Sequence, residues 1–131
     1  MKLLLDTHIW IWAELEPERL SKRVASALAN PANEIWLSPI SVWELLLLVE
    51  KRRVKLAHEP HEWVDEAWSR SPLHEAPINR QVAMLSRVAR TPQQDLADRF
   101  LAATAAVYDL TLVTADENLL RGKGYRLLPN R

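Results

Sequence analysis

Two aspartates stand just beyond short apolar runs near opposite ends of the chain. Asp6 directly follows the apolar residues 3–5, and Asp116 comes two positions after the run 110–114. Runs of this kind are typical of buried strands in a parallel sheet. Ligands of open parallel α/β sheets bind beyond the carboxyl ends of the strands, so we expect Asp6 and Asp116 to be neighbours in a site there.

Three further acids are placed to join this pair. Glu44 lies early in an expected helix, and Asp95 and Asp98 are three residues apart, on one face of another. Two unit charges about 4 Å apart repel by roughly 4 kcal/mol at an effective dielectric near 20, so such a cluster calls for a compensating cation. Carboxylate oxygens suit Mg²⁺ or Mn²⁺. The corresponding chemistry is phosphodiester hydrolysis, in which the ion activates water and neutralises charge on the phosphoryl group.

The elements that must position these acids alternate between strands and helices. Continuous apolar segments predict strands at residues 3–5, 34–38, 110–114 and 125–129. Apolar residues at helical spacing predict helices from Pro17, over 39–53, from Pro60, from Asn79 and over 92–109. Ser38 and Pro39 are typical of a helix start, with serine as the cap and proline at the first position. The pattern predicts an α/β fold, with a central parallel sheet covered by helices on both faces.

Composition narrows the possible functions. The chain of 131 residues is most simply one domain, and with no cysteine it offers no thiolate zinc site. Its two glycines exclude both a Walker loop and a GxGxxG fingerprint. Seventeen basic and seventeen acidic residues give zero net charge, so binding of nucleic acid needs a local basic patch, a metal ion or a partner. The apolar runs are too short for a signal peptide or a membrane span, and we expect a cytoplasmic protein.

Four segments together resemble a known family. They are "LLLDTHIWIW", "LSPISVWELLLLVEKRRVKL", "DLADRFLAATA" and "LTLVTADENLL", which occur in the family's order and cover the chain almost end to end. They resemble PIN-domain ribonucleases, and specifically the VapC-type toxins of bacterial and archaeal toxin–antitoxin pairs. One departure is "EKRRVKL", where relatives often carry a glycine before the last apolar residue; it concerns a turn and not the site.

The resemblance implies both an architecture and an activity. The architecture is a three-layer α/β/α PIN-like domain over residues 1–131. The activity is that of a metal-dependent endoribonuclease, a toxin silenced by a cognate antitoxin, with RNA as substrate and a homodimer as the assembly. The implied ligands of Mg²⁺ or Mn²⁺ are an acidic quartet, with Asp95 as a secondary candidate: Asp6, Glu44, Asp98 and Asp116.

Each acid also has a purely structural interpretation. Asp95 near a helix start is favoured by the helix dipole alone, and we prefer that interpretation for it. Glu44 fits a capping box with Ser41, unless the helix begins at Pro39, which would place Glu44 in the second turn and is the start that we favour. Asp116 could cap a short helix over 117–120 and still face a metal.

Neighbouring residues add secondary hypotheses. Thr7 and Thr114 adjoin the acids at the strand ends and could orient a carboxylate. Lys51, Arg52 and Arg53 form a basic run that either contacts the RNA backbone or is a solvated helix end. Two rival functions remain open on the sequence: a metal-free binding module, and a phosphatase-like α/β domain that uses a strand-end aspartate.

Overall fold

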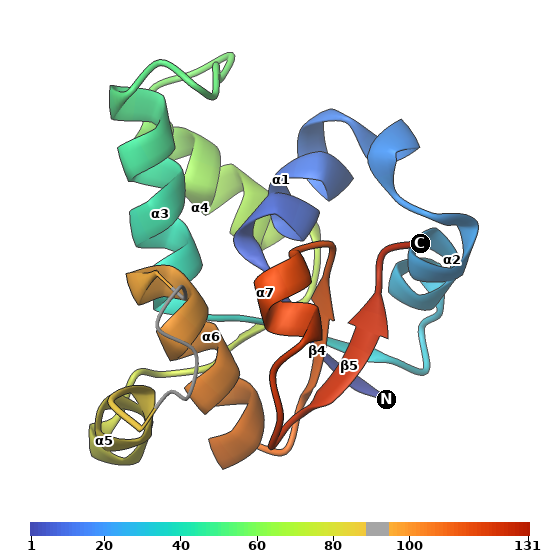
Figure 1. Cartoon of the computed structure of the whole chain (residues 1–131). Coiled ribbons are helices and arrows are strands. Elements are labelled where there is room, and N and C mark those ends of the chain that lie inside the picture. The colour runs from blue at the N-terminus through green and yellow to red at the C-terminus, as the bar shows by residue number, and fades with distance from the viewer. Residues whose placement is uncertain (89–94) are drawn as a thin grey trace.

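The computed structural model describes residues 1–88 and 95–131, built around a parallel sheet (Figure 1). Its strands run in the order β3-β2-β1-β4-β5, all parallel to their neighbours. Their bounds are β1 Lys2–Leu5, β2 Glu34–Leu37, β3 Leu73–Glu75, β4 Thr111–Thr114 and β5 Arg126–Pro129. The sequence predicted all of these except β3. That edge strand has three residues, of which His74 and Glu75 are exposed, so it carries no apolar signal.

The strand order places the first and fourth strands side by side. Leu3 pairs with Thr111 and Leu5 with Val113, and the backbone N–H of Asp6 continues the ladder by donating to the Val113 carbonyl at 3.0 Å. Because the strands are parallel and in register, both end at the same edge of the sheet. The expectation that the two strands end side by side, at one edge of the sheet, is therefore confirmed.

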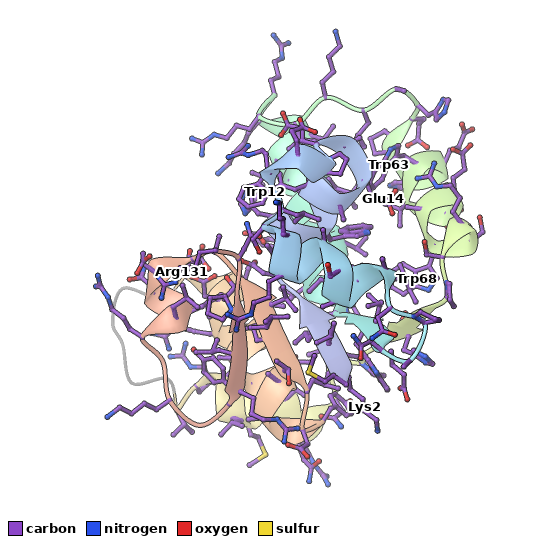
Figure 2. All side chains as sticks on the ribbon, turned by 90° about the vertical axis from the view of Figure 1, so that its right-hand side faces the viewer. Lys2, Trp12, Glu14, Trp63, Trp68 and Arg131 are labelled. Atoms are coloured by element: carbon purple, nitrogen blue, oxygen red, sulfur yellow. The ribbon has the colours of Figure 1, made fainter. Side chains whose placement is uncertain are left out.

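Helices cover both faces of the sheet, and the three-layer α/β/α architecture is confirmed. Leu3 and Leu5 belong to one apolar cluster, with α1, α2, α3 and α4, whereas Leu4 faces the other, with α6 and α7. This division follows from the alternation of side chains along a strand. Trp63 of α4, labelled in Figure 2, packs against Trp10 of α1, and the ring centroids are 5.6 Å apart. The helices are α1 Thr7–Leu15, α2 Lys22–Ala29, α3 Pro39–Glu50, α4 Pro60–Arg70, α5 Arg80–Ser86, α6 Leu96–Val107 and α7 Glu117–Leu120.

Several helix boundaries differ from the sequence prediction. The segment of α1 had no predicted element, since its isoleucines and tryptophans have only moderate helix propensity; burial of Ile9, Trp10 and Ile11 stabilises it instead. Pro17 begins only a 3₁₀ turn, Pro17–Arg19, and α2 starts after Ser21, whose hydroxyl accepts the Val24 N–H.

The long helix predicted from Pro92 also starts later than expected. It begins at Leu96 with Asp95 as its N-cap, and residues 92–94 lie outside the described part of the chain. Within the described residues, no helix is both long and apolar enough to cross a membrane.

Candidate metal and active site

Asp6 is a buried carboxylate at the centre of the sheet's carboxyl edge. It occupies the N-cap position of α1, yet its side chain makes no capping hydrogen bond. Its Oδ2 instead accepts a hydrogen bond from Thr114 Oγ1 at 2.7 Å, and only 5% of the residue is exposed. An aspartate that could have capped a helix is thus turned toward β4, where its carboxylate lies beside the other strand-end groups.

Thr114 links the two strand-end aspartates. Besides donating to Asp6, its Oγ1 accepts the backbone N–H of Asp116 at 3.0 Å. Asp116 in turn caps α7: its Oδ1 accepts the N–H groups of Asn118 at 2.8 Å and Leu119 at 3.2 Å. The short helix predicted after Asp116 is therefore present. One carboxylate oxygen of Asp116 serves as the cap, which anchors the side chain at the edge of the sheet.

Glu44 is held in the second turn of α3. The helix begins at Pro39, and the Ser38 hydroxyl accepts the Ile40 N–H at 3.1 Å. The Pro39 start is thus confirmed, and the alternative in which Ser41 and Glu44 form a capping box is wrong, because Ser41 lies inside the helix.

The buried Ser41 hydroxyl has another partner, which the sequence analysis missed. It accepts a hydrogen bond from Thr7 Oγ1 at 3.0 Å, and both residues are fully buried. This bond ties the start of α1, one residue after Asp6, to the helix that carries Glu44. A serine inside a helix gives no sign of such a partner 34 residues away in the sequence.

Asp98 and Asp95 lie at the start of α6. Asp95 is the N-cap, and its Oδ1 accepts the Asp98 N–H at 2.8 Å. The interpretation of Asp95 as a helix-terminal acid is therefore confirmed. Asp98 itself is only 8% exposed, which is rare for an acid.

The acids lie within one another's electrostatic field. Burial, followed by the charges of Asp95, Asp116, Asp6 and Glu44, raises the pKa of Asp98 to about 8. Burial also raises the pKa of Asp6 to about 6; the Thr114 hydrogen bond and His8 lower it, while Glu44 and Asp116 raise it further. The charges of all the acids named from the sequence therefore influence Asp98, and Asp6 and Asp98 have the most strongly raised pKa values.

This donor set fits a hard divalent cation. Among the described residues, no group of three or more acidic or histidine side chains is placed so that it could hold a metal ion. Mg²⁺ does not require one, because it usually keeps several waters and binds through one or two carboxylates. The elevated pKa values of Asp6 and Asp98 mark carboxylates whose ionised forms a cation would stabilise.

The basic run lies away from the acids. Lys51 is the C-cap of α3, and Arg52 follows in a left-handed conformation with φ of 59°. Both residues and Arg53 are exposed, and none of them forms an ion pair with another described residue. Lys51 lies seven positions after Glu44, which corresponds to about 10 Å along the helix axis.

Comparison with known proteins agrees with this fold. Residues 3–124 match the PIN domain family, and the chain belongs to it. Ribonuclease VapC22 of Mycobacterium tuberculosis is 34% identical over 124 residues, covering 89% of this chain and 88% of that protein.

Solved structures share the fold. VapBC2 from Rickettsia felis, crystallised with a DNA fragment from its promoter, superposes with a TM-score of 0.74 at 23% identity, covering 98% of each chain. DNA-bound VapBC from Salmonella typhimurium gives a TM-score of 0.71 at 23% identity, with 100% of this chain and 99% of that chain covered.

Proposed function

We propose that this protein is a metal-dependent endoribonuclease and the toxin of a toxin–antitoxin pair. The observation that carries the proposal is the pair of strand ends at the carboxyl edge of the sheet, where Thr114 joins the buried Asp6 to Asp116 through two hydrogen bonds. Membership of the PIN domain family and the likeness to a VapC ribonuclease support it. Membership also weighs against the phosphatase-like alternative.

The metal site would be formed by the acidic quartet Asp6, Glu44, Asp98 and Asp116. PIN-domain ribonucleases as a group depend on a metal, and we propose Mg²⁺ or Mn²⁺ here because every donor is a carboxylate oxygen. When bound, such an ion activates water and neutralises charge on the phosphoryl group. Asp95 remains a secondary candidate, since its cap to α6 uses one oxygen only.

The chain's own residues prepare these carboxylates. The Thr114 hydroxyl favours the ionised form of Asp6, which burial alone would disfavour. Its second hydrogen bond, from the Asp116 N–H, fixes the turn by which the chain leaves β4 and enters α7. The Thr7–Ser41 bond holds α3, and with it Glu44, against the start of α1. Hydroxyl groups that restrict the rotation of ligands lower the entropic cost of binding a metal.

RNA and protein partners complete the proposal. Single-stranded RNA would reach the acids with support from the exposed Lys51, Arg52 and Arg53. A cognate antitoxin is proposed as the inhibitor because the structural relatives are VapBC assemblies. We further propose a cytoplasmic location and a homodimer; size-exclusion chromatography with light scattering of the purified chain tests the latter.

Cleavage of a single-stranded RNA with and without metal tests the activity. We expect cutting with Mg²⁺ or Mn²⁺ and none in EDTA. Asp116→Asn should abolish cutting and yet keep α7 capped, because asparagine caps as well as aspartate. The matched control is Asp109→Asn, which removes an exposed charge outside the site at a position whose φ of 55° asparagine tolerates. Undiminished cleavage in EDTA would contradict the proposed metal dependence. If no metal supports cleavage, the alternative of a metal-free binding module would be favoured.

A further inference from the structure

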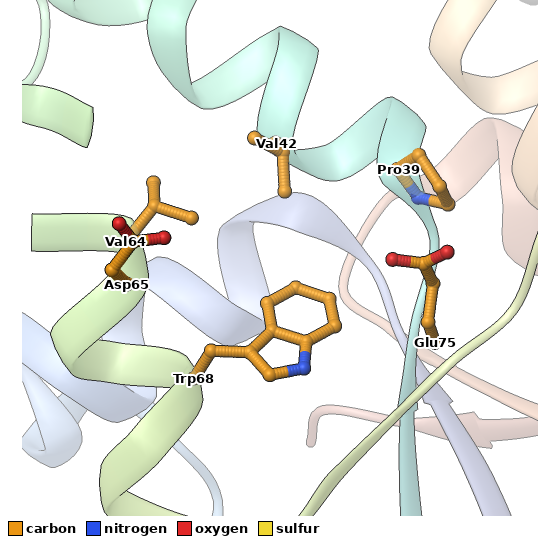
Figure 3. A pocket seen from close by; sticks show the side chains of 6 residues that line it. All are labelled: Pro39, Val42, Val64, Asp65, Trp68 and Glu75. Atoms are coloured by element: carbon orange, nitrogen blue, oxygen red, sulfur yellow. The ribbon is translucent and has the colours of Figure 1, made fainter. Parts of the chain in front are cut away.

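A pocket of about 440 Å³ opens between α3, α4 and the end of β3, apart from the acidic site (Figure 3). Pro39, the first residue of α3, and Glu75, the last of β3, place the pocket at the same carboxyl edge of the sheet. Val42 lines the pocket, and Glu44 lies two residues further, about 200° around the helix axis. The pocket and the acidic site therefore occupy different sides of α3.

The lining combines an apolar surface with two carboxylates. Figure 3 shows the indole ring of Trp68 lying across the pocket between α4 and β3, with Val42 on the facing helix. Asp65 and Glu75 flank this ring from α4 and β3, and both are exposed. Within the described residues, neither carboxylate forms an ion pair. The chain thus leaves two negative charges beside an accessible aromatic ring.

This combination matches one kind of side chain. Arginine has an apolar stem, a flat cation that stacks on tryptophan, and a fork of N–H groups that pairs with carboxylates. Two uncompensated carboxylates also repel the phosphates of RNA, so a nucleic-acid strand is a poor occupant. A neutral apolar side chain would leave both charges unpaired.

We propose that this pocket binds an arginine side chain presented by a polypeptide partner. Identifying that polypeptide as the antitoxin rests on the proposed function, whereas the recognition of arginine does not. The pocket would then anchor the partner at the same edge of the sheet as the acidic site, without using any proposed metal ligand. A segment bound there would run along the carboxyl edge of the sheet, where substrate must also approach.

The test follows the indole N–H signal of Trp68 by NMR during titration with N-acetyl-arginine amide, after assignment with Trp68→Phe. The neutral citrulline analogue is the matched ligand. We expect arginine to shift the Trp68 signal, and citrulline to shift it far less at the same concentration. Asp65→Asn with Glu75→Gln should weaken arginine binding about threefold or more, as loss of exposed ion pairs does. Glu62→Gln, an exposed acid of the same helix that does not line the pocket, should leave binding unchanged.

Three results would overturn the assignment. Equal shifts from arginine and citrulline would show that charge is not recognised. A Trp68 shift caused by raising the protein concentration alone would make a second copy of the chain the occupant. A larger response to a short RNA than to arginine would make nucleic acid the occupant.

A separate measurement tests whether the arginine belongs to the antitoxin. In the complex with the cognate antitoxin, the Asp65→Asn/Glu75→Gln double variant should bind about tenfold more weakly, while RNA cleavage without antitoxin is unchanged. Unchanged antitoxin affinity would remove the antitoxin as the source of the arginine. Failure of RNA cleavage in the parent protein would instead contradict the proposed function. The proposal that the pocket binds arginine would then be decided by the NMR titration alone.

Discussion

The Thr114 hydroxyl lies 2.7 Å from Oδ2 of Asp6, although 108 residues separate the two in the sequence. Both residues are buried at the carboxyl edge of the sheet, Thr114 fully and Asp6 to all but 5%. A buried carboxylate without a donor is costly. The hydroxyl therefore keeps Asp6 available as an anion and also orients it toward β4.

Removing the Thr114 hydroxyl should change the pKa of Asp6. In Thr114→Val we expect the pKa of Asp6 to rise above its value of about 6, because the hydrogen bond that lowers it is lost. Stability should fall by about 1–3 kcal/mol, since the buried acceptor loses its partner, and RNA cleavage should fall. NMR titration of Asp6 and denaturant unfolding measure these effects. Thr114→Ser, which keeps the hydroxyl, is the control; a Val variant with the parent pKa would contradict the assigned role.

Asp98→Asn should abolish cleavage without destabilising the metal-free fold. At pH 7 the folded protein keeps a proton on Asp98, whose pKa is about 8, while the unfolded chain releases it. An amide avoids this difference, so in EDTA the variant should melt no lower than the parent. A gain of 1 kcal/mol would raise Tm by about 3 °C. Clear destabilisation in EDTA would mean that structural hydrogen bonds hold the carboxylate.

The effect of added Mn²⁺ on thermal stability should show whether Asp98 or Asp95 is the metal ligand. A ligand present at 100 times its Kd stabilises the folded state by about 2.7 kcal/mol. We expect the parent to gain thermal stability with Mn²⁺ and Asp98→Asn to gain much less. Asp95→Asn is the matched control, because asparagine can still cap α6. If Asp95→Asn loses the Mn²⁺ response and Asp98→Asn keeps it, Asp95 is the ligand.

The stability of the metal-free protein should decrease as pH rises. Unfolded aspartates titrate near pH 3.9, whereas folded Asp6 and Asp98 keep their protons to about 6 and about 8. Between these values the folded state binds more protons than the unfolded state, so the free energy of unfolding falls with pH. Thermal melts in EDTA from pH 4 to 9 measure this, and Asp98→Asn should flatten the slope above pH 6. A parent curve that rises across this range would contradict the raised pKa values.

RNA affinity should depend on salt through the basic end of α3. Replacing Lys51 and Arg53 with alanine and Arg52 with asparagine, which tolerates its φ of 59°, removes three charges. If each contacts a phosphate, the slope of log K against log salt should shrink by about 2 for single-stranded RNA. A triple alanine variant of the exposed Lys2, Lys22 and Arg23 is the control. Lys22 and Arg23 belong to α2, which Figure 1 shows on the opposite side of the molecule from α3, and Lys2 is the first residue of β1, at the other end of the strand from Asp6. Equal slopes for both variants would mean that Lys51, Arg52 and Arg53 form a solvated helix end and do not contact the RNA backbone.

Local signals in the sequence were sufficient for much of this structure. Ser38 with Pro39 marks the start of α3, and the apolar run ending at Asp6 marks β1, because caps and buried strands depend on neighbours within a few positions. The same holds for Asp116 as the cap of α7. Together these signals also placed Asp6 and Asp116 at strand ends and Glu44 in the second turn of a helix, and the family resemblance added Asp98 to the candidate site.

Contacts between distant segments decided the rest. The β3 strand exists because Ile35 and Leu37 offer it a partner, and α1 is helical because its apolar residues pack against the sheet. The Thr7–Ser41 bond and the flanking of Trp68 by Asp65 and Glu75 join residues from separate elements. Each depends on strand order and helix packing, which no local pattern encodes. The chain by itself therefore determined which acids could form a site, and only the tertiary structure decided how hydroxyl groups hold them and where a second pocket opens.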